Sequence, residues 1–216
     1  MSDKSRAFKI QTCPFEEDDQ LYKKDEIEIN SGLTVLVGCN GSGKTTLLQA
    51  INEQLRNIPN VAVLHYSNLS NGGQAAKDKA GFNDNFELLA TLLCSSEGEQ
   101  VVINLGQTSR QIGGFVKKHH EECKEIWVLL DAIDSGLSID NIIDIKEHLF
   151  KTMLKSFETK DCELYLVVVA NSYEMCSEAN CFDVTSGEYI KFQSYPEYKE
   201  FILNSKKYKD QRYDNS

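Results

Sequence analysis

The chain has 216 residues, of which 41% are hydrophobic, and this is enough for the core of one α/β domain. Its formal net charge of −10 argues against a nucleic-acid-binding surface, so DNA or RNA would be bound only through a local basic patch or a partner protein. The scattered cysteines form no CxxC pair, and no apolar run suggests a signal peptide or a membrane span, so a reduced cytoplasmic protein is expected.

Strands and helices are predicted to alternate along the chain. Short apolar runs rich in β-branched residues indicate strands, and apolar residues repeating every three or four positions indicate helices. The predicted strands lie within residues 7–15, at the end of 16–30, and at 33–38, 61–66, 125–130 and 163–170. The predicted helices cover residues 45–56, 86–94, 98–120, 141–157 and 194–203. This alternation predicts an α/β fold with a mainly parallel sheet, which binds its ligand at the carboxyl ends of the strands.

The last third of the chain allows more specific predictions. The helix at 141–157 is expected to place Ile142, Ile145, Leu149, Met153 and Phe157 near one apolar face. Residues 181–192 predict a hairpin that turns at Ser186-Gly187.

The final helix also has a predicted start and end. Ser194 and Glu197 have the spacing of a capping box, which would begin this helix. Residues 206–216 are expected to fray.

One motif carries most of the chemical information. Residues 38–45 match GxxxxGK[ST], the phosphate-binding loop or Walker A motif, between a predicted strand and a predicted helix. The motif consists of Gly38, Cys39, Asn40, Gly41, Ser42, Gly43, Lys44 and Thr45, and Thr46 follows it. The glycines let backbone N–H groups turn toward phosphates, and the helix N-terminus adds a positive dipole end. Lys44 is expected to reach the β- and γ-phosphates of ATP, and Thr45 to hold Mg²⁺.

A second motif predicts the other side of the metal site. Residues 126–130 form an apolar strand that ends in Asp131, which is the Walker B pattern. Asp131 is expected to reach the coordination shell of the Mg²⁺. No motif identifies the aromatic residue that stacks on adenine, and Phe8, Phe15 and Tyr22 are the candidates.

Together, GCNGSGKTT and LLDAIDSGLS resemble the head of an ABC-type ATPase. Transporter domains usually continue the Walker B strand with Glu-Pro-Thr, and the SMC/RecF branch usually continues it with Glu-x-Asp. Here Ala132-Ile133-Asp134 follows, so Asp134 favours the SMC/RecF branch. The resemblance implies a P-loop NTPase fold over one domain, 1–216, with a helical lobe near 75–125 and a C-terminal hairpin and helix near 181–205.

The resemblance also implies a signature motif that caps the γ-phosphate bound by a second subunit. SSEGE at residues 95–99 precedes a long predicted helix, and we assign the signature there, to Ser95, Ser96, Gly98 and Glu99. The stretch LSNGGQ looks closer to the family pattern, but it carries an inserted Asn and lies where the family has its Q-loop. Gln74 is therefore the candidate Q-loop residue that contacts Mg²⁺.

Two positions depart from an efficient ATPase of this family. Ala132 stands where the family carries the glutamate that activates the attacking water, and Asn171 stands where it usually has the switch histidine. Loss of the general base alone would cost about 10²–10⁴-fold in rate. Ala132 fits either a substitution that traps the ATP-bound state, which we favour, or a natural slow hydrolase or switch.

The resemblance implies a head-to-head homodimer that holds ATP and Mg²⁺ between its subunits and closes when ATP binds. Residues at Lys44, Asp131, Ala132 and Asn171 would form the catalytic positions. A partner or effector protein is expected to carry the output, with no membrane association, and by analogy the process could be DNA repair or antiviral defence. The alternatives are the nucleotide-binding subunit of an ABC transporter, a non-hydrolysing nucleotide-gated binding module, and a small-molecule kinase.

Overall fold

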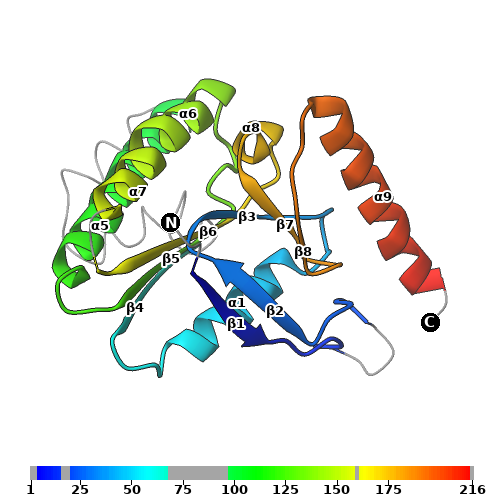
Figure 1. The fold of residues 1–216 in the computed structure, drawn as a ribbon. Helices are drawn as coiled ribbons and strands as arrows, with labels where there is room; N and C mark the ends of the chain where they lie inside the picture. The colour runs from blue at the N-terminus through cyan, green and yellow to red at the C-terminus, as the bar shows by residue number, and fades with distance from the viewer. Residues whose placement is uncertain (1–3, 16–19, 68–96, 159–160, 215–216) are drawn as a thin grey trace.

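A six-stranded sheet lies at the centre of the computed structural model, which describes residues 4–15, 20–67, 97–158 and 161–214 (Figure 1). Its strands, in spatial order, are β4 (Val61–Ser67), β5 (Glu125–Asp131), β6 (Glu163–Val169), β3 (Gly32–Val37), β7 (Asn180–Asp183) and β8 (Glu188–Ile190). The pairings from β4 to β7 are parallel, and β8 pairs antiparallel with β7. The predicted α/β fold with a mainly parallel sheet is therefore confirmed.

Each face of this sheet packs against its own apolar cluster. Along β5, Ile126 and Val128 belong to one cluster, and Trp127 and Leu129 belong to the other, because side chains alternate across a strand. Figure 1 shows one face covered by α5 (Glu97–His119), α6 (Ile139–Asp144), η1 (Ile145–Phe150), α7 (Lys151–Phe157) and α8 (Tyr173–Cys176). The other face is covered by α1 (Lys44–Leu55) and by an antiparallel pair, β1 (Ser5–Lys9) and β2 (Glu26–Asn30).

The helix predicted at 141–157 differs from the expectation in its internal register. It is helical from Ile139, and the residues from Ile145 to Phe150 form a π-helical segment between α6 and α7. Leu149 is only partly buried, whereas Phe150 is fully buried. A π turn contains an extra residue, so the apolar face passes from Ile145 to Phe150 instead of to Leu149.

The hairpin after β6 is confirmed, with β7 and β8 flanking the predicted turn. α9 (Tyr195–Asp214) follows it, but its start differs from the predicted capping box. Glu197 Oε2 accepts the backbone N–H of Gln193 at 2.8 Å, one residue before the expected position at Ser194. The carboxylate therefore stabilises the turn that leads into the helix.

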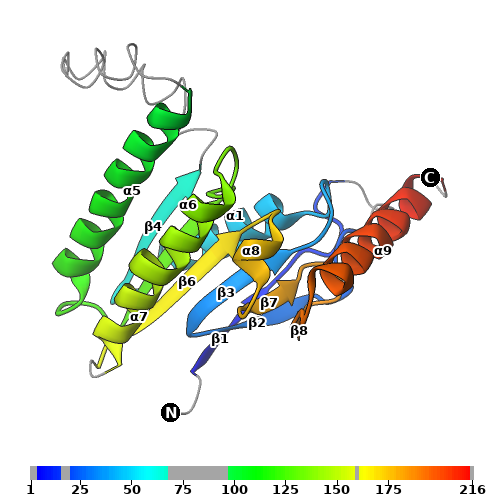
Figure 2. The same cartoon turned by 90° about the horizontal axis from the view of Figure 1, so that it is seen from above.

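The prediction that residues 206–216 fray is wrong for residues 206–214, because α9 continues to Asp214, and the last two residues lie outside the described part of the chain. Contacts with the rest of the molecule stabilise its last turns. The ammonium group of Lys23 lies 4.8 Å from the centre of the Tyr208 ring, and Lys209 Nζ donates to the backbone oxygen of Asn40 at 3.1 Å. Figure 2 shows α9 running along the edge of the sheet formed by β7 and β8.

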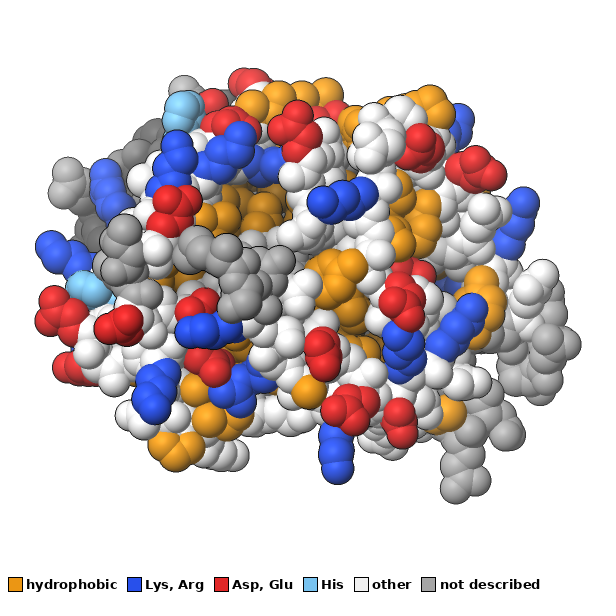
Figure 3. Space-filling view, in the orientation of Figure 1, with side chains coloured by type: hydrophobic (Ala, Val, Ile, Leu, Met, Phe, Trp, Pro, Cys, Tyr) orange, Lys and Arg blue, Asp and Glu red, His pale blue; other side chains and the backbone are white. Residues whose placement is uncertain are grey.

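The surface and the remaining elements bear on the other expectations. On the face seen in Figure 3, basic and acidic side chains of the described residues are interspersed, so this face offers no continuous basic surface for nucleic acid. Within the described residues, no helix is both long and apolar enough to cross a membrane. The helix predicted at 86–94 lies outside the described residues, and the lobe predicted near 75–125 is described only from Glu97 onward.

Candidate functional site

The phosphate-loop sequence lies where the carboxyl end of β3 passes into α1. β3 ends at Val37, and α1 begins at Lys44. The connecting loop needs backbone conformations that side chains with a Cβ rarely adopt, since Gly41 has a φ of 78° and Gly43 a φ of 93°. The first turn of α1 leaves backbone N–H groups without partners inside the helix, so the start of α1 beside this loop offers donors that an anion can use.

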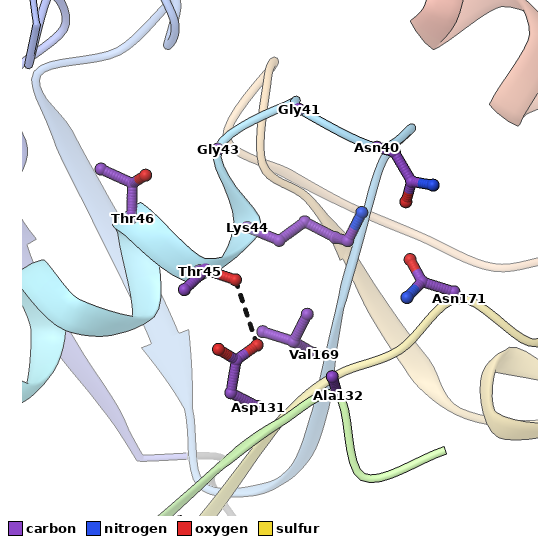
Figure 4. A pocket seen from close by; sticks show the side chains of 10 residues that line it. All are labelled: Asn40, Gly41, Gly43, Lys44, Thr45, Thr46, Asp131, Ala132, Val169 and Asn171. Atoms are coloured by element: carbon purple, nitrogen blue, oxygen red, sulfur yellow. Dashed lines mark hydrogen bonds between the residues drawn. The ribbon is translucent and has the colours of Figure 1, made fainter. Parts of the chain in front are cut away.

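Lys44 lies along the inside of this loop (Figure 4). Its side chain is buried, and Nζ donates to the backbone oxygens of Gly38 at 2.8 Å and Cys39 at 3.0 Å. Burial, which disfavours the ammonium form, lowers the pKa of Lys44 below its ordinary value. A phosphate group bound in the loop would supply the negative charge that these carbonyl dipoles only partly provide.

Thr45 and Asp131 come together from different elements. Thr45 Oγ1, at the start of α1, donates to Asp131 Oδ1, at the end of β5, over 3.1 Å (Figure 4). A hydroxyl and a carboxylate oxygen at this separation are ligands that suit Mg²⁺, which otherwise takes water and phosphate oxygens. No group of three or more His, Cys, Asp or Glu that could hold a metal occurs in the described residues. The Thr45–Asp131 pair would supply a hydroxyl and a carboxylate oxygen to an Mg²⁺ whose other ligands are water or phosphate oxygens.

A pocket of about 220 Å³ joins these groups. Sites that enclose a whole small molecule usually measure roughly 300–1,000 Å³, so this pocket suits phosphates and a metal, with the base outside it. Its lining consists of Asn40, Gly41, Gly43, Lys44, Thr45, Thr46, Asp131, Ala132, Val169 and Asn171. The pocket thus brings together all four residues predicted at catalytic positions, while Gly38, Cys39 and Ser42 belong to the loop without lining it.

Ala132 and Asn171 occupy the side of the pocket beyond Asp131. Ala132 has a φ of 54°, a left-handed conformation that is costly for a residue with a Cβ. Its methyl group offers no proton acceptor to a water molecule. Asn171 follows β6, and Figure 4 shows its amide and that of Asn40 on the side toward which Lys44 extends. The pocket therefore contains hydrogen-bonding amides but no carboxylate at position 132.

Asp134 has a role that sequence reasoning missed. It is buried, and its Oδ2 accepts the backbone N–H groups of Asn171 and Ser172, each at 2.8 Å. The Tyr198 hydroxyl donates to the backbone oxygen of Asn171 at 2.7 Å. These contacts hold both sides of the same peptide segment, so Asp134 and Tyr198 set the position of Asn171. The sequence shows that Asp134 is an acidic residue close to Walker B, but it does not indicate which backbone groups Asp134 contacts.

The three aromatic candidates for adenine stacking differ in their surroundings. Phe8 is buried and packs edge-on against Trp127 with ring centres 5.3 Å apart, so the proposal that it stacks on adenine is wrong. Tyr22 is also buried, and its hydroxyl donates to the backbone oxygen of Gly43 at 2.8 Å, which supports the loop from below. Phe15 is 68% exposed, so it alone among the three presents a free ring.

The predicted signature and Q-loop are only partly described. Gln74, Ser95 and Ser96 lie outside the described residues, and Gly98 and Glu99 lie in the first turn of α5. Figure 2 shows that α5 begins on the side of the sheet where β4 ends, and β5 ends on this side as well because it pairs parallel with β4. The start of α5 and the phosphate loop therefore both lie at the carboxyl ends of the parallel strands.

Comparison with known proteins agrees with the phosphate-loop assignment over a limited part of the chain. A family model described as an AAA domain (AAA_23) matches residues 20–53, which include β2, β3, the phosphate loop and most of α1. No curated protein matches the chain. Over residues 20–53, therefore, the chain is similar to this AAA-domain family, and the match includes the phosphate-loop sequence.

Proposed function

We propose that this protein is an ATP-binding switch of the ABC type, from the SMC/RecF-like branch, that closes as a head-to-head homodimer around ATP and Mg²⁺. The observation that carries the proposal is the pocket in which the loop at Lys44, the Thr45–Asp131 pair and Asn171 converge. The match to an AAA-domain model over residues 20–53 supports nucleotide binding. The dimer and the branch rest on the resemblance of the motifs.

Different residues of the pocket would bind different parts of the triphosphate and its Mg²⁺. The N–H groups of the loop and the start of α1 would bind phosphate oxygens, and Lys44 would exchange its carbonyl partners for the β- and γ-phosphates. Thr45 and Asp131 would hold Mg²⁺, which neutralises part of the phosphate charge. Asn171 would hydrogen-bond the γ-phosphate from the opposite wall, at a position fixed by Asp134 and Tyr198.

In this proposal, Ala132 allows ATP to be bound but makes its hydrolysis slow. Lys44, Thr45 and Asp131 are all present to bind ATP and Mg²⁺, but no side chain at position 132 can accept a proton from water. The protein would therefore hold ATP long enough for the closed dimer to engage a partner or effector protein, and it would reopen slowly. This property favours a second candidate function, a nucleotide-gated binding module with no useful turnover.

The test compares ATP turnover and molecular mass for the chain as given, for Ala132→Glu, and for Ala132→Gln as a control that adds length without a carboxylate. We expect the Ala132 protein to bind ATP·Mg²⁺, to double its mass, and to hydrolyse slowly. Ala132→Glu should hydrolyse about 10²–10⁴-fold faster than the other two.

Three outcomes would change the proposal. A protein that binds ATP but keeps its monomer mass would exclude the sandwich dimer. If Ala132→Glu also fails to hydrolyse ATP, the ATPase activity is excluded and the binding module remains. If no form binds ATP, both candidate functions are excluded.

A further inference from the structure

α9 presents one side of its surface to the nucleotide pocket. Its residues that are at least partly buried recur every three or four positions, the spacing of a single helical face. They are Tyr198, Phe201, Ile202, Ser205, Tyr208 and Lys209. The apolar members pack on the molecule, with the Phe192 ring 5.3 Å from the rings of both Tyr198 and Phe201. The polar members have more specific partners.

The C-terminal half of this face contacts the phosphate loop directly. The backbone N–H of Cys39 donates to Ser205 Oγ at 3.1 Å, and Lys209 Nζ donates to the backbone oxygen of Asn40 at 3.1 Å. The Lys209 side chain is only 23% exposed, although Asp210 lies 4.0 Å away. A Cβ on Gly41 would lie 3.7 Å from Lys209 Nζ. α9 thus places a hydroxyl and a partly buried cation on the outer side of the loop.

The N-terminal half of the same face contacts the opposite wall of the pocket. Tyr198 is buried, and its hydroxyl holds the backbone oxygen of Asn171 at 2.7 Å. Tyr198 and Lys209 are separated by about three helical turns, or roughly 16 Å. One rigid helix therefore contacts both loops that line the pocket. Each contact is to a backbone atom, so a shift of either loop changes the contact directly.

We propose that α9 is a clamp that positions both walls of the nucleotide pocket, with Tyr198, Ser205 and Lys209 as its positioning residues. The inference rests on the proposed binding of ATP and extends it to a helix outside the motifs. Lys209 adds positive charge beside the phosphate loop, and the two hydroxyl contacts fix the loops before nucleotide arrives. Phosphates that draw the two loops together would tighten the docking of α9, which makes this helix a reporter of the bound nucleotide.

The test uses the full chain and removes the polar contacts while keeping the apolar ones. Ser205→Ala combined with Lys209→Met removes the phosphate-loop contacts, and Tyr198→Phe removes one hydroxyl and retains the ring. Matched controls are Lys206→Met and Tyr195→Phe, which change exposed residues of the same helix. Binding of ATP and ADP is measured by titration, and hydrogen exchange of residues 195–214 is followed with and without ATP·Mg²⁺.

We expect ATP to slow exchange in α9 of the unsubstituted protein and of both controls. Each clamp variant should bind ATP roughly three- to tenfold more weakly, the effect of losing one or two hydrogen bonds, and should lose most of the ATP-dependent protection. A helix with only a structural role would lose stability on substitution but would show the same protection when ATP is added.

The results separate the clamp from the underlying function. If the unsubstituted protein binds ATP, and the clamp variants bind it equally well with unchanged protection of α9, the clamp is excluded and ATP binding stands. If the unsubstituted protein binds no ATP, the proposed function fails first, and the clamp that depends on it fails as well.

Discussion

At the scale of single residues, Gly41 and Gly43 of the loop after β3 differ in their surroundings. A Cβ on Gly43 would lie 2.5 Å from Leu21 Cδ2 and 2.8 Å from the Tyr22 hydroxyl oxygen, in addition to requiring a φ of 93°. Gly41 also has a positive φ, of 78°, but the nearest atom to its added Cβ is Lys209 Cδ at 3.5 Å, an ordinary contact.

Gly43→Ala should therefore destabilise the protein more than Gly41→Ala. Backbone strain alone costs about 1–2 kcal/mol, which both substitutions incur, and overpacking against Leu21 and Tyr22 adds about 1–3 kcal/mol for Gly43. Urea unfolding of the two variants measures the difference. Equal losses of unfolding free energy would contradict this account of the contacts below the loop.

Lys44 gives the site a dependence on pH. Burial lowers its pKa below the ordinary value of 10.5, and bound phosphates would raise it again. ATP binding should therefore take up protons above the lowered pKa, and affinity should fall as pH rises through it. The same burial penalises the charged form of the nucleotide-free protein, so the contribution of Lys44 to the free energy of unfolding rises as pH increases from the lowered pKa toward 10.5.

Calorimetry near pH 7 and pH 9, in buffers with different enthalpies of ionisation, measures this proton uptake. Lys44→Arg is the control, because a guanidinium stays charged across this range and should contribute no uptake. Identical proton uptake by both proteins at the higher pH would assign the effect to another group.

At the scale of elements, the π-helical segment between α6 and α7 decides which side chain fills the core. Phe150 is fully buried and Leu149 is only partly buried, although they are neighbours in the sequence. Phe150→Ala should cost about 3–5 kcal/mol of unfolding free energy, as for other large core side chains. Leu149→Ala should cost clearly less. Thermal or urea unfolding measures both, and a larger loss for Leu149→Ala would indicate a regular α-helix in solution.

The elements also show how far sequence reasoning reaches. The strands at Val35 and Val128 and the loop before Lys44 were predictable, because local composition and spacing determine them. The π turn was not predictable, because the spacing of the apolar residues is also compatible with a regular α-helix. Packing against the sheet is what buries Phe150. The length of α9 was also missed, because its charged last turns are stabilised by Asn40, which is distant in the sequence.

In the site, too, local motifs predict some residues, whereas the roles of others depend on contacts between distant parts of the chain. Motifs that encode local geometry predict the phosphate-loop residues and Asp131, and the fold places Thr45 and Asp131 in contact. The roles of Asp134 and Tyr198 became visible only when the fold brought both to the peptide segment at Asn171. No pattern in the sequence links a residue after β5 to one in α9.

At the scale of the whole molecule, the net charge of −10 bears on the proposed dimer. Two such subunits, each carrying a nucleotide, repel one another at low salt, and the repulsion is screened as the Debye length falls to about 8 Å at physiological ionic strength. ATP-dependent dimerisation should therefore be several-fold tighter near 0.3 M salt than near 0.03 M. Sedimentation at several salt concentrations measures this, with Lys44→Met as a monomeric control. A dimer that weakens with salt would instead require charge pairs across its interface.

The order of strands in the sheet has a consequence for how the chain is made. β3, which leads into the phosphate loop, lies between β6 and β7, although both are synthesised long after it. During translation, the apolar residues of β3 therefore remain unpaired with β6 and β7 until those strands have been synthesised. Such delayed pairing slows folding and leaves a hydrophobic segment open to association with other chains. The segment that leads into the proposed nucleotide site is thus also one that needs protection in the nascent chain.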